Sequence, residues 1–397
     1  MRAMCIVFVL LLAAFGCQSP ESNSAKPAVI SEQALVPADN VTSTAESAAQ
    51  AAGQSATQPV AEQLKTDGLK APVLTDEGQG ADSLDSMVLI PAGTYTMGSD
   101  GPEAEPHEGP ALTVSISPFY LDRHEVTNKQ FAAFVATTGY VTVAERPVDW
   151  NVLRKELPPG TPKPPAEMLL PGSLVFTPPN QAVPLHDYFA WWSWVSGADW
   201  RHPTGPASNI DGKDDFPVVQ VAHEDALAYA TWAGKRLPTE AEWEFAARGG
   251  KDGLPFSWGD ELKPGGRYLA NFFQGDFPHR NSAADGYPGA APVGRYIPNA
   301  YGLYDMIGNV WEWTSDWYRP DTKAHYAALG NAACHDPVGP SQSLDPDEPM
   351  VPKRVIKGGS FLCSEQYCSN YRPSARMASA SDTGQNHVGF RCAKDAS

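Results

Sequence analysis

Two cysteines five residues apart carry the clearest potential for chemistry in this 397-residue chain. Cys363 and Cys368 lie in the polar run KGGSFLCSEQYCSNYR, which spans residues 357–372. This spacing suits a local disulfide, a redox pair, or a two-thiolate metal site, which would select a soft ion such as Cu(I). A disulfide would close only a small loop and add little stability. Arg372 and Arg376 follow closely, and their positive charge could favour a thiolate. These residues alone leave the alternatives open.

Two other segments are rich in oxygen donors. Residues 271–287 carry Asn271, Gln274, Asp276, Asn281 and Asp285, and residues 305–312 place Asp305 and Glu312 around a Gly-Asn turn. Ca²⁺ takes roughly six to eight oxygen ligands and commonly orders such loops. Asn and Asp are also frequent in solvated turns for backbone reasons. Residues 302–317 overlap the second segment and bring three tryptophans together, which suits a core or the wall of a site.

The start of the chain predicts export. Met1 and Arg2 precede an apolar run over residues 5–15, which is too short to span a bilayer and ends at Gly16 and Cys17. A small residue before a cysteine resembles a bacterial lipobox. We therefore expect residues 1–17 to be a signal peptide and the mature protein to lie in the periplasm or cell envelope on a lipid anchor. Residues 18–86 have almost no aromatics, which predicts a disordered tether.

Residues 87–397 form the expected folded domain. The chain has 37 Pro and 34 Gly, which favour irregular backbone, and a formal net charge of −17, which excludes nucleic acid as a partner. Capping boxes at Thr127 and Thr239 predict helices that end near Gly139 and Gly249. A third helix is expected over 223–233. Strands are expected over 87–97, with a Pro-Ala-Gly turn, and over 112–121. The pattern predicts a single α+β domain with low regular secondary structure and long loops.

Several longer motifs are spread along this domain, each occurring once. They are FYLDRHEVT (119–127), GADWRHP (197–203), LPTEAEWE (237–244), GNVWEW (308–313), GGSFLCSEQYCSNY (358–371) and GFRC (389–392). On these residues the domain resembles the formylglycine-generating enzyme family, also called the sulfatase-modifying factor family. The resemblance covers nearly all of residues 87–395 and implies that family's C-type-lectin-like fold. The run with both cysteines is what resembles the catalytic subgroup.

The resemblance implies an O₂-dependent oxidoreductase that uses Cu(I) to convert a cysteine in a sulfatase Cys-x-Pro-x-Arg motif to Cα-formylglycine. Its partners would be O₂ and unfolded or nascent sulfatase polypeptides. By position, the copper ligands would be Cys363 and Cys368, and the other active-site residues would be Ser360, Trp311, Tyr367 and Arg376. Two calcium sites are also implied. The first would use Asn271, Asp285 and the carbonyls of Phe272 and Tyr287, and the second Asp305, Glu312 and the carbonyls of Gly308 and Val310.

The chain departs from the family pattern at a few positions. Asp305 and His387 each replace an Asn. The cysteine that pairs with Cys392 in some relatives is absent, as are both cysteines of a second family disulfide, so Cys334 is the remaining candidate partner for Cys392. One rival interpretation is a non-catalytic binding module whose Cys363–Cys368 pair is a structural disulfide. The other is an iron-dependent sulfoxide synthase, which would need a histidine-rich helical domain. No histidine precedes residue 87.

Overall fold

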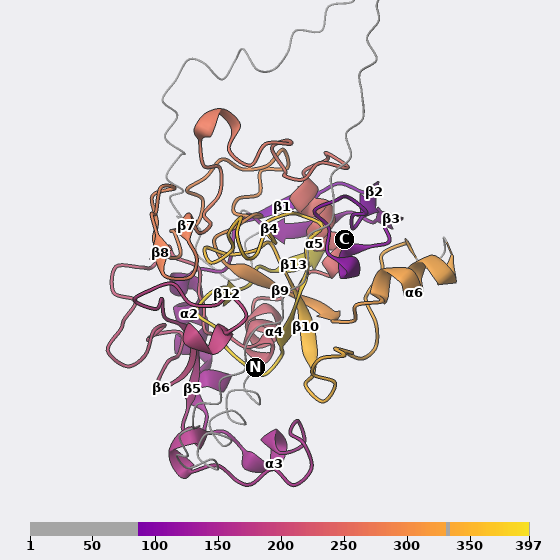
Figure 1. Ribbon diagram of the computed structural model, residues 1–397. Helices are drawn as coiled ribbons and strands as arrows, with labels where there is room; N and C mark the ends of the chain where they lie inside the picture. The colour runs from indigo at the N-terminus through magenta and orange to yellow at the C-terminus, as the bar shows by residue number, and fades with distance from the viewer. Residues whose placement is uncertain (1–85, 331–333, 397) are drawn as a thin grey trace, which may run out of the picture. The chain divides into compact units, whose positions relative to one another are not determined.

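A computed structural model describes residues 86–330 and 334–396 (Figure 1). The predicted signal peptide and nearly all of the predicted tether lie outside the described residues, so both remain predictions. The described residues fall within one compact unit. Within them, no helix has the length and apolar composition needed to cross a bilayer.

A four-stranded sheet lies at the centre, in the order β11-β10-β9-β12. Its strands are β9 (Trp311–Trp317), β10 (Lys353–Lys357), β11 (Met377–Ala380) and β12 (Val388–Gly389). β9 and β10 pair antiparallel, as do β10 and β11, whereas β12 runs parallel to β9. The long strand β9 is almost entirely buried, which explains why its sequence, WEWTSDW, is so rich in tryptophan.

The two strands expected from sequence are each divided. Residues 87–97 form β1 (Met87–Ile90) and β2 (Gly93–Met97), and residues 112–121 form β3 (Leu112–Ile116) and the start of β4 (Phe119–Asp122). The breaks fall at Pro91 and Pro118, since proline cannot donate a ladder hydrogen bond. β1, β4 and β13 (Ala393–Asp395) make a three-stranded sheet, while β2 and β3 pair separately. The predicted Pro-Ala-Gly turn is therefore confirmed in the first segment, whereas the second segment, predicted as one strand, is divided.

The predicted helices are confirmed with small shifts at their ends. They are α2 (Asn128–Thr138), α4 (His223–Trp232) and α5 (Glu240–Arg248). Both capping boxes form, since the hydroxyls of Thr127 and Thr239 accept the backbone N–H three residues on. Gly139 and Gly249 end α2 and α5 in the left-handed conformation, which glycine adopts without steric cost.

The remaining elements are short. Two-stranded pairs are β5 (Gly172–Phe176) with β6 (Trp192–Ser196), and β7 (Gly275–Asp276) with β8 (Arg280–Asn281). The short α-helices are α3 (Trp150–Leu153) and α6 (Thr322–Leu329), and the sequence predicted neither. 3₁₀ turns lie at Pro106–Glu108, Val143–Glu145, Ala166–Leu169, Tyr188–Ala190 and Pro264–Gly266. Long loops join these elements, so the α+β, loop-rich fold class is confirmed.

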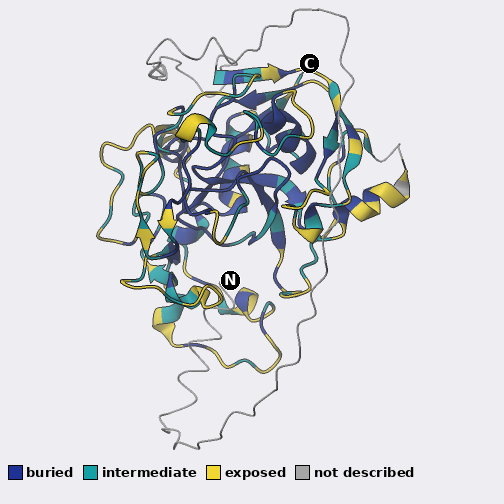
Figure 2. Cartoon of the chain, turned by 45° about the horizontal axis from the view of Figure 1, so that its top comes forward, coloured by how far each residue is buried: buried dark blue, intermediate teal, exposed yellow. Residues whose placement is uncertain are grey.

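Buried residues gather at the centre and exposed ones follow the outer loops (Figure 2). The largest apolar cluster joins α2 and α4 to β9 and includes Cys363 and Trp311. A second cluster joins α5 to β1–β4. Below α5 lies a buried ion network in which Glu240 and Glu244 pair with Lys323, Lys357, Arg248 and Arg376.

Candidate active site at the paired cysteines

The two cysteines face each other across a tight hairpin. Ser364 N donates to the Cys368 carbonyl at 3.0 Å, and Cys368 N donates to the Ser364 carbonyl at 3.0 Å. These bonds bring the two Sγ atoms to 3.1 Å. This distance is well beyond the roughly 2.05 Å of a disulfide, and both cysteines are free. The pair is therefore a dithiol, which can donate two soft ligands to one metal ion.

The two thiols differ in their environment. Burial raises the pKa of Cys363, and the hydrogen bond to Cys368 raises it further. The same hydrogen bond lowers the pKa of Cys368, and the positive charge of Arg372 adds to this effect. The lower pKa of Cys368 means that, when the pair loses a proton, Cys368 is the cysteine that becomes the thiolate. Cys368 is also partly exposed, whereas Cys363 is buried.

We expect Cys368 to react with iodoacetamide well before Cys363 at neutral pH. A thiolate is the nucleophile, and a lowered pKa keeps Cys368 ionised at pH values where an ordinary thiol is protonated. Peptide mapping of protein alkylated for increasing times, without copper, measures both rates. Faster modification of Cys363, or equal rates at all pH values, would contradict this assignment of the proton.

Ser360 contacts Cys363, and Trp311 belongs to the same apolar cluster. The Ser360 carbonyl accepts the Cys363 N–H at 2.9 Å, and the Ser360 hydroxyl helps to lower the pKa of Cys363 against the effect of burial. Trp311 packs in the same apolar cluster as Cys363. Gly359 has a φ of +75°, and a Cβ there would lie 3.0 Å from the Tyr371 Cα. The glycine pair thus allows Ser360 to pack this close to the cysteine hairpin.

Tyr367 lies at the exposed end of an aromatic group beside the thiols. Its ring stacks on Phe277 with centroids 4.8 Å apart and meets Trp191 edge-on at 5.8 Å. Tyr367 is 41% exposed and Tyr188 is 42% exposed, which is unusual for side chains of this size. These rings form an accessible aromatic surface next to Cys368.

His387, the departure noted from sequence, is placed next to Trp311. Its carbonyl accepts the Trp311 N–H at 2.9 Å, and its ring lies 4.9 Å from that of Trp192. Burial lowers the pKa of His387 to about 3, so the imidazole is neutral at physiological pH. It therefore adds a polar but uncharged ring behind the site.

Arg376 is placed differently from the other predicted residues. Its guanidinium is buried against Glu240 at 2.7 Å and donates to the carbonyl of Arg319 at 2.8 Å. No hydrogen bond between Arg376 and either sulfur is found among the described residues. Arg372 is the arginine that acts on Cys368, and its own position is fixed by a buried pair with Glu108 at 2.6 Å. The role predicted for Arg376 is not supported by these contacts.

The first predicted calcium site is organised around Asp285. Asp285 accepts hydrogen bonds from the N–H groups of Phe272 and Tyr287, each at 3.0 Å. The side-chain oxygen of Asn271 is buried and has no hydrogen-bond partner. The Gln274 amide lies between the Phe272 carbonyl and Asp285, and it donates to both. The unsatisfied Asn271 oxygen fits a cation, which would replace the Gln274 amide.

The second predicted site holds an excess of negative charge. Glu312 is fully buried, and Arg391 donates to its two oxygens at 2.7 Å each. Asp305 is also buried, and desolvation raises its pKa to about 6. Glu125, which the sequence did not single out, joins them: burial and then the charge of Asp305 raise its pKa, and its Oε2 has no hydrogen-bond partner. Three buried carboxylates therefore lie near one guanidinium, and burial of this many acidic groups carries an electrostatic cost.

Both oxygen-rich segments are hydrogen-bonded directly to the cysteine loop. Phe273 N donates to the Cys363 carbonyl at 2.8 Å, and Gly308 N donates to the Gly358 carbonyl at 2.9 Å. Within residues 86–330 and 334–396, no group of three or more His, Cys, Asp and Glu has the arrangement of a metal site. Any calcium must therefore be bound in part through backbone carbonyl and amide oxygens.

The remaining two cysteines lie apart from the pair. Cys392 is buried in the α2–α4 cluster, and Cys334 packs against the α5 cluster. Both are free thiols in the structure. A disulfide between them is therefore not seen.

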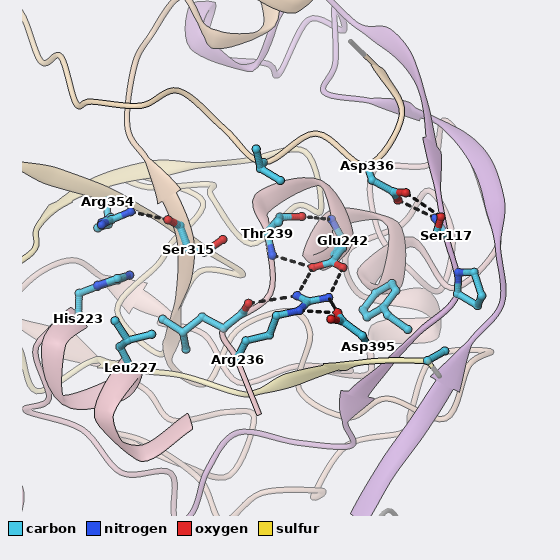
Figure 3. A pocket seen from close by; sticks show the side chains of 15 residues that line it. Ser117, His223, Leu227, Arg236, Thr239, Glu242, Ser315, Asp336, Arg354 and Asp395 are labelled. Atoms are coloured by element: carbon cyan, nitrogen blue, oxygen red, sulfur yellow. Dashed lines mark hydrogen bonds and ion pairs between the residues drawn. The ribbon is translucent and has the colours of Figure 1, made fainter. Parts of the chain in front are cut away.

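A hollow of about 610 Å³ lies away from the cysteines (Figure 3). Arg236 crosses its floor and pairs with Glu242 and Asp395, each at 2.7 Å, while Arg354 and Asp336 lie at opposite ends. Its lining contains no cysteine and none of the predicted site residues. This hollow is therefore separate from the predicted chemical site.

Comparison with known proteins decides the family. Residues 74–396 match the sulfatase-modifying factor enzyme 1-like domain, which is most of the chain. The chain belongs to this family. A formylglycine-generating enzyme from Mycobacterium tuberculosis is 48% identical over 79% of this chain and 98% of its own length. One from Thermomonospora curvata is 47% identical over 78% of this chain and 93% of its own length.

The family also contains relatives named as inactive. An inactive Cα-formylglycine-generating enzyme 2 from Bos taurus is 37% identical over 78% of this chain and 88% of its own length. Among solved structures, that of PvdO from Pseudomonas aeruginosa is 27% identical and covers 78% of this chain and 94% of its own, with a TM-score of 0.49. Membership of the family therefore does not by itself establish catalysis.

Proposed function

We propose that this protein converts a cysteine in sulfatase Cys-x-Pro-x-Arg motifs to Cα-formylglycine, using O₂ and Cu(I). The observation that carries the proposal is the dithiol itself, two free sulfurs 3.1 Å apart in a family of formylglycine-generating enzymes. The alternative is a non-catalytic binding module on the same fold, with Cys363 and Cys368 joined in a structural disulfide. The family also contains relatives named as inactive.

The residues have separable roles in this proposal. Cys363 and Cys368 would hold Cu(I), which supplies the electron-transfer chemistry with O₂ that thiols alone lack. Ser360, which hydrogen-bonds Cys363, and Trp311, which shares its apolar cluster, would form the wall of the pocket for O₂ and the client thiol. Tyr367 and its aromatic neighbours offer apolar contacts to a client peptide. Overall, the client –CH₂–SH group becomes –CHO and sulfur leaves as H₂S. Reduction of O₂ to water requires two further electrons from a thiol reductant.

Co-expression tests this function in cells. A sulfatase with the motif is expressed with this protein in a host that lacks such an enzyme, and its motif peptide is analysed by mass spectrometry. Aldehyde at the motif cysteine is the expected result. An unmodified cysteine in a sulfatase that folds and is exported would contradict the proposal.

We also propose two structural Ca²⁺ ions, at Asn271–Asp285 and at Asp305–Glu312. The support is the unsatisfied Asn271 oxygen at the first site and the excess of buried carboxylates at the second. Because both segments are bonded to the cysteine loop, these ions would also hold the thiols in place.

Export and lipid anchoring are proposed from Gly16 and Cys17. Cys17→Ser should release the protein from the membrane fraction without changing its melting temperature, because the tether contributes no core. Fractionation of cells that express each form measures this. Wild-type protein found entirely outside the membrane fraction would rule out the anchor.

A further inference from the structure

The hollow beside Arg236 has the size of a binding site for a small molecule. Its volume is about 610 Å³, and pockets of roughly 300–1,000 Å³ are common for such ligands. Parts of α4, α5, β9 and β10 line it, together with the C-terminal residues that the structure describes (Figure 3). A ligand in the hollow would therefore contact none of the predicted active-site residues.

Part of the lining is apolar and exposed. Leu227 is 47% exposed and Val338 is 74% exposed, although both side chains are hydrophobic. Phe119 and Leu237 add buried apolar surface to the same lining. An apolar group that covered these side chains would remove their surface from water, which favours binding.

One end of the hollow carries a cation without an anionic partner. Among the described residues, Arg354 forms no ion pair: its guanidinium donates to the Ser315 carbonyl and lies over the Trp317 ring, 3.3 Å from the centroid. Its Nε is buried and has no hydrogen-bond partner in the same part of the chain. Burial lowers the pKa of Arg354, because its contacts do not replace the lost water. The charge is therefore held in place but not neutralised.

The three carboxylates that line the hollow are engaged elsewhere. Glu242 and Asp395 both pair with Arg236 at 2.7 Å. Asp336 accepts hydrogen bonds from the backbone N–H and the hydroxyl of Ser117, each at 2.7 Å. Asp336 also lies at the opposite end of the hollow from Arg354 (Figure 3). None of these carboxylates therefore competes directly for the guanidinium of Arg354.

His223 lies at the same end of the hollow as Arg354 and Leu227 (Figure 3). Burial, and then the charge of Arg354, lower the pKa of His223 to about 4, so its ring is neutral at physiological pH. Arg354 is thus the charged group at this end. The formal net charge of −17 disfavours anions at long range, so binding of an anion here would depend on Arg354.

We propose that the hollow binds a small organic acid, whose carboxylate pairs with Arg354 while its apolar body covers Leu227 and the neighbouring apolar lining. A planar guanidinium suits a carboxylate, since it donates two parallel hydrogen bonds. Binding requires no thiol, copper or client peptide, so the inference is independent of the proposed function. A free aliphatic acid and the C-terminal residue of a peptide share this chemistry, and the choice of probes distinguishes them.

Isothermal titration calorimetry on the wild-type protein compares four probes. Octanoate has both the charge and the apolar body, octanol lacks the charge, and octylammonium reverses it. N-acetyl-Leu-Leu with a free carboxylate represents a peptide C-terminus. Octanoate should bind at least about tenfold more tightly than octanol or octylammonium, because a hydrogen bond to a charged group is strong. Tighter binding of N-acetyl-Leu-Leu than of octanoate would identify a peptide as the source of the carboxylate.

Variants test the two parts of the site separately. Arg354→Gln should abolish the preference for octanoate over octanol, whereas Arg354→Lys should keep part of it. Leu227→Gln should weaken octanoate and octanol alike, by about two- to fivefold, since it removes apolar contact but no charge. Arg201→Gln is the matched control, because Arg201 also lies over a tryptophan ring, at 4.1 Å, but does not line the hollow. This control should leave both affinities unchanged.

Thermal melts without ligand show whether each variant is folded. Leu227 is exposed, so its variant tests the hollow even if loss of the contact between Arg354 and Trp317 unfolds the other variants. Equal binding of octanoate and octanol to the wild type, or no octanoate binding with a Kd below about 1 mM, would overturn the proposal. Undiminished octanoate binding to folded Arg354→Gln would also overturn it, since the carboxylate would then bind elsewhere.

Discussion

Replacement of either Cys363 or Cys368 by serine is expected to abolish aldehyde formation while the protein stays folded. A serine hydroxyl is a hard, protonated ligand that cannot replace a thiolate on Cu(I), so the remaining cysteine would be left alone. We expect turnover to fall by at least about a thousandfold, because removal of a group that acts as a unit removes nearly all of its effect. The free thiols contribute no cross-link, so melting temperatures should change by only a few degrees.

Peptide turnover, Cu(I) competition against a chelator and thermal melts are measured on the same preparations. Cys392→Ser is the matched control, since Cys392 is buried in the same apolar cluster as Cys363 but is not paired with it. This variant should keep both copper binding and turnover. The copper mechanism fails if either active-site variant retains peptide oxidation, or if the wild type binds no Cu(I). The binding-module interpretation would then take its place.

Glu312→Gln should destabilise the fold more than any other single change considered. Glu312 is completely buried and accepts hydrogen bonds from Arg391 and from Trp243 Nε1, all at 2.7 Å. The neutral amide leaves the Arg391 guanidinium without its partner. Breaking a buried ion pair from one side costs about 3–5 kcal/mol. Denaturant unfolding of purified wild type and variant measures this difference.

A matched control variant and a chelator separate loss of the buried ion pair from loss of bound calcium. Glu224 pairs with Arg146 at the same 2.7 Å but with both side chains exposed, so Glu224→Gln should cost less than about 1 kcal/mol. Calcium bound to the native state would stabilise it by mass action, so a chelator should lower the wild-type melting temperature. The chelator should lower the melting temperature of Glu312→Gln by less than that of the wild type. An equal, small loss of unfolding free energy in both glutamate variants would contradict the importance of the buried ion pair. A wild-type melting temperature unchanged by the chelator would count against both proposed Ca²⁺ ions.

The sequence predicted the parts of this structure that depend on local chemistry. Thr127 and Thr239 predicted two helix starts because a capping box satisfies backbone groups within three residues. The hairpin that brings Cys363 to Cys368 is equally local. The family resemblance then assigned Ser360, Trp311 and Tyr367 to the active site. In the structure Ser360 hydrogen-bonds Cys363, and Trp311 shares the apolar cluster of Cys363, while the catalytic roles of all three stay predictions.

Contacts between distant parts of the chain were beyond such reasoning. Glu125 joins Asp305 and Glu312 only because the fold brings β4 next to the segment before β9, and nothing in its own sequence marks it. Glu108 was also missed, although it holds Arg372 in place next to the thiols. Arg376, which the family resemblance assigned to the active site, makes its observed contacts with Glu240 and the Arg319 carbonyl, so its role there stays a prediction.

The most direct test of the account uses purified protein and a Cys-x-Pro-x-Arg peptide, with copper, a thiol reductant and O₂. Mass spectrometry and an aldehyde-specific hydrazide probe measure the product. The account predicts aldehyde at the cysteine, lost when O₂ is removed and when a Cu(I) chelator is added. A peptide that stays unmodified with copper-loaded, folded protein, or is converted equally well without O₂, would contradict it.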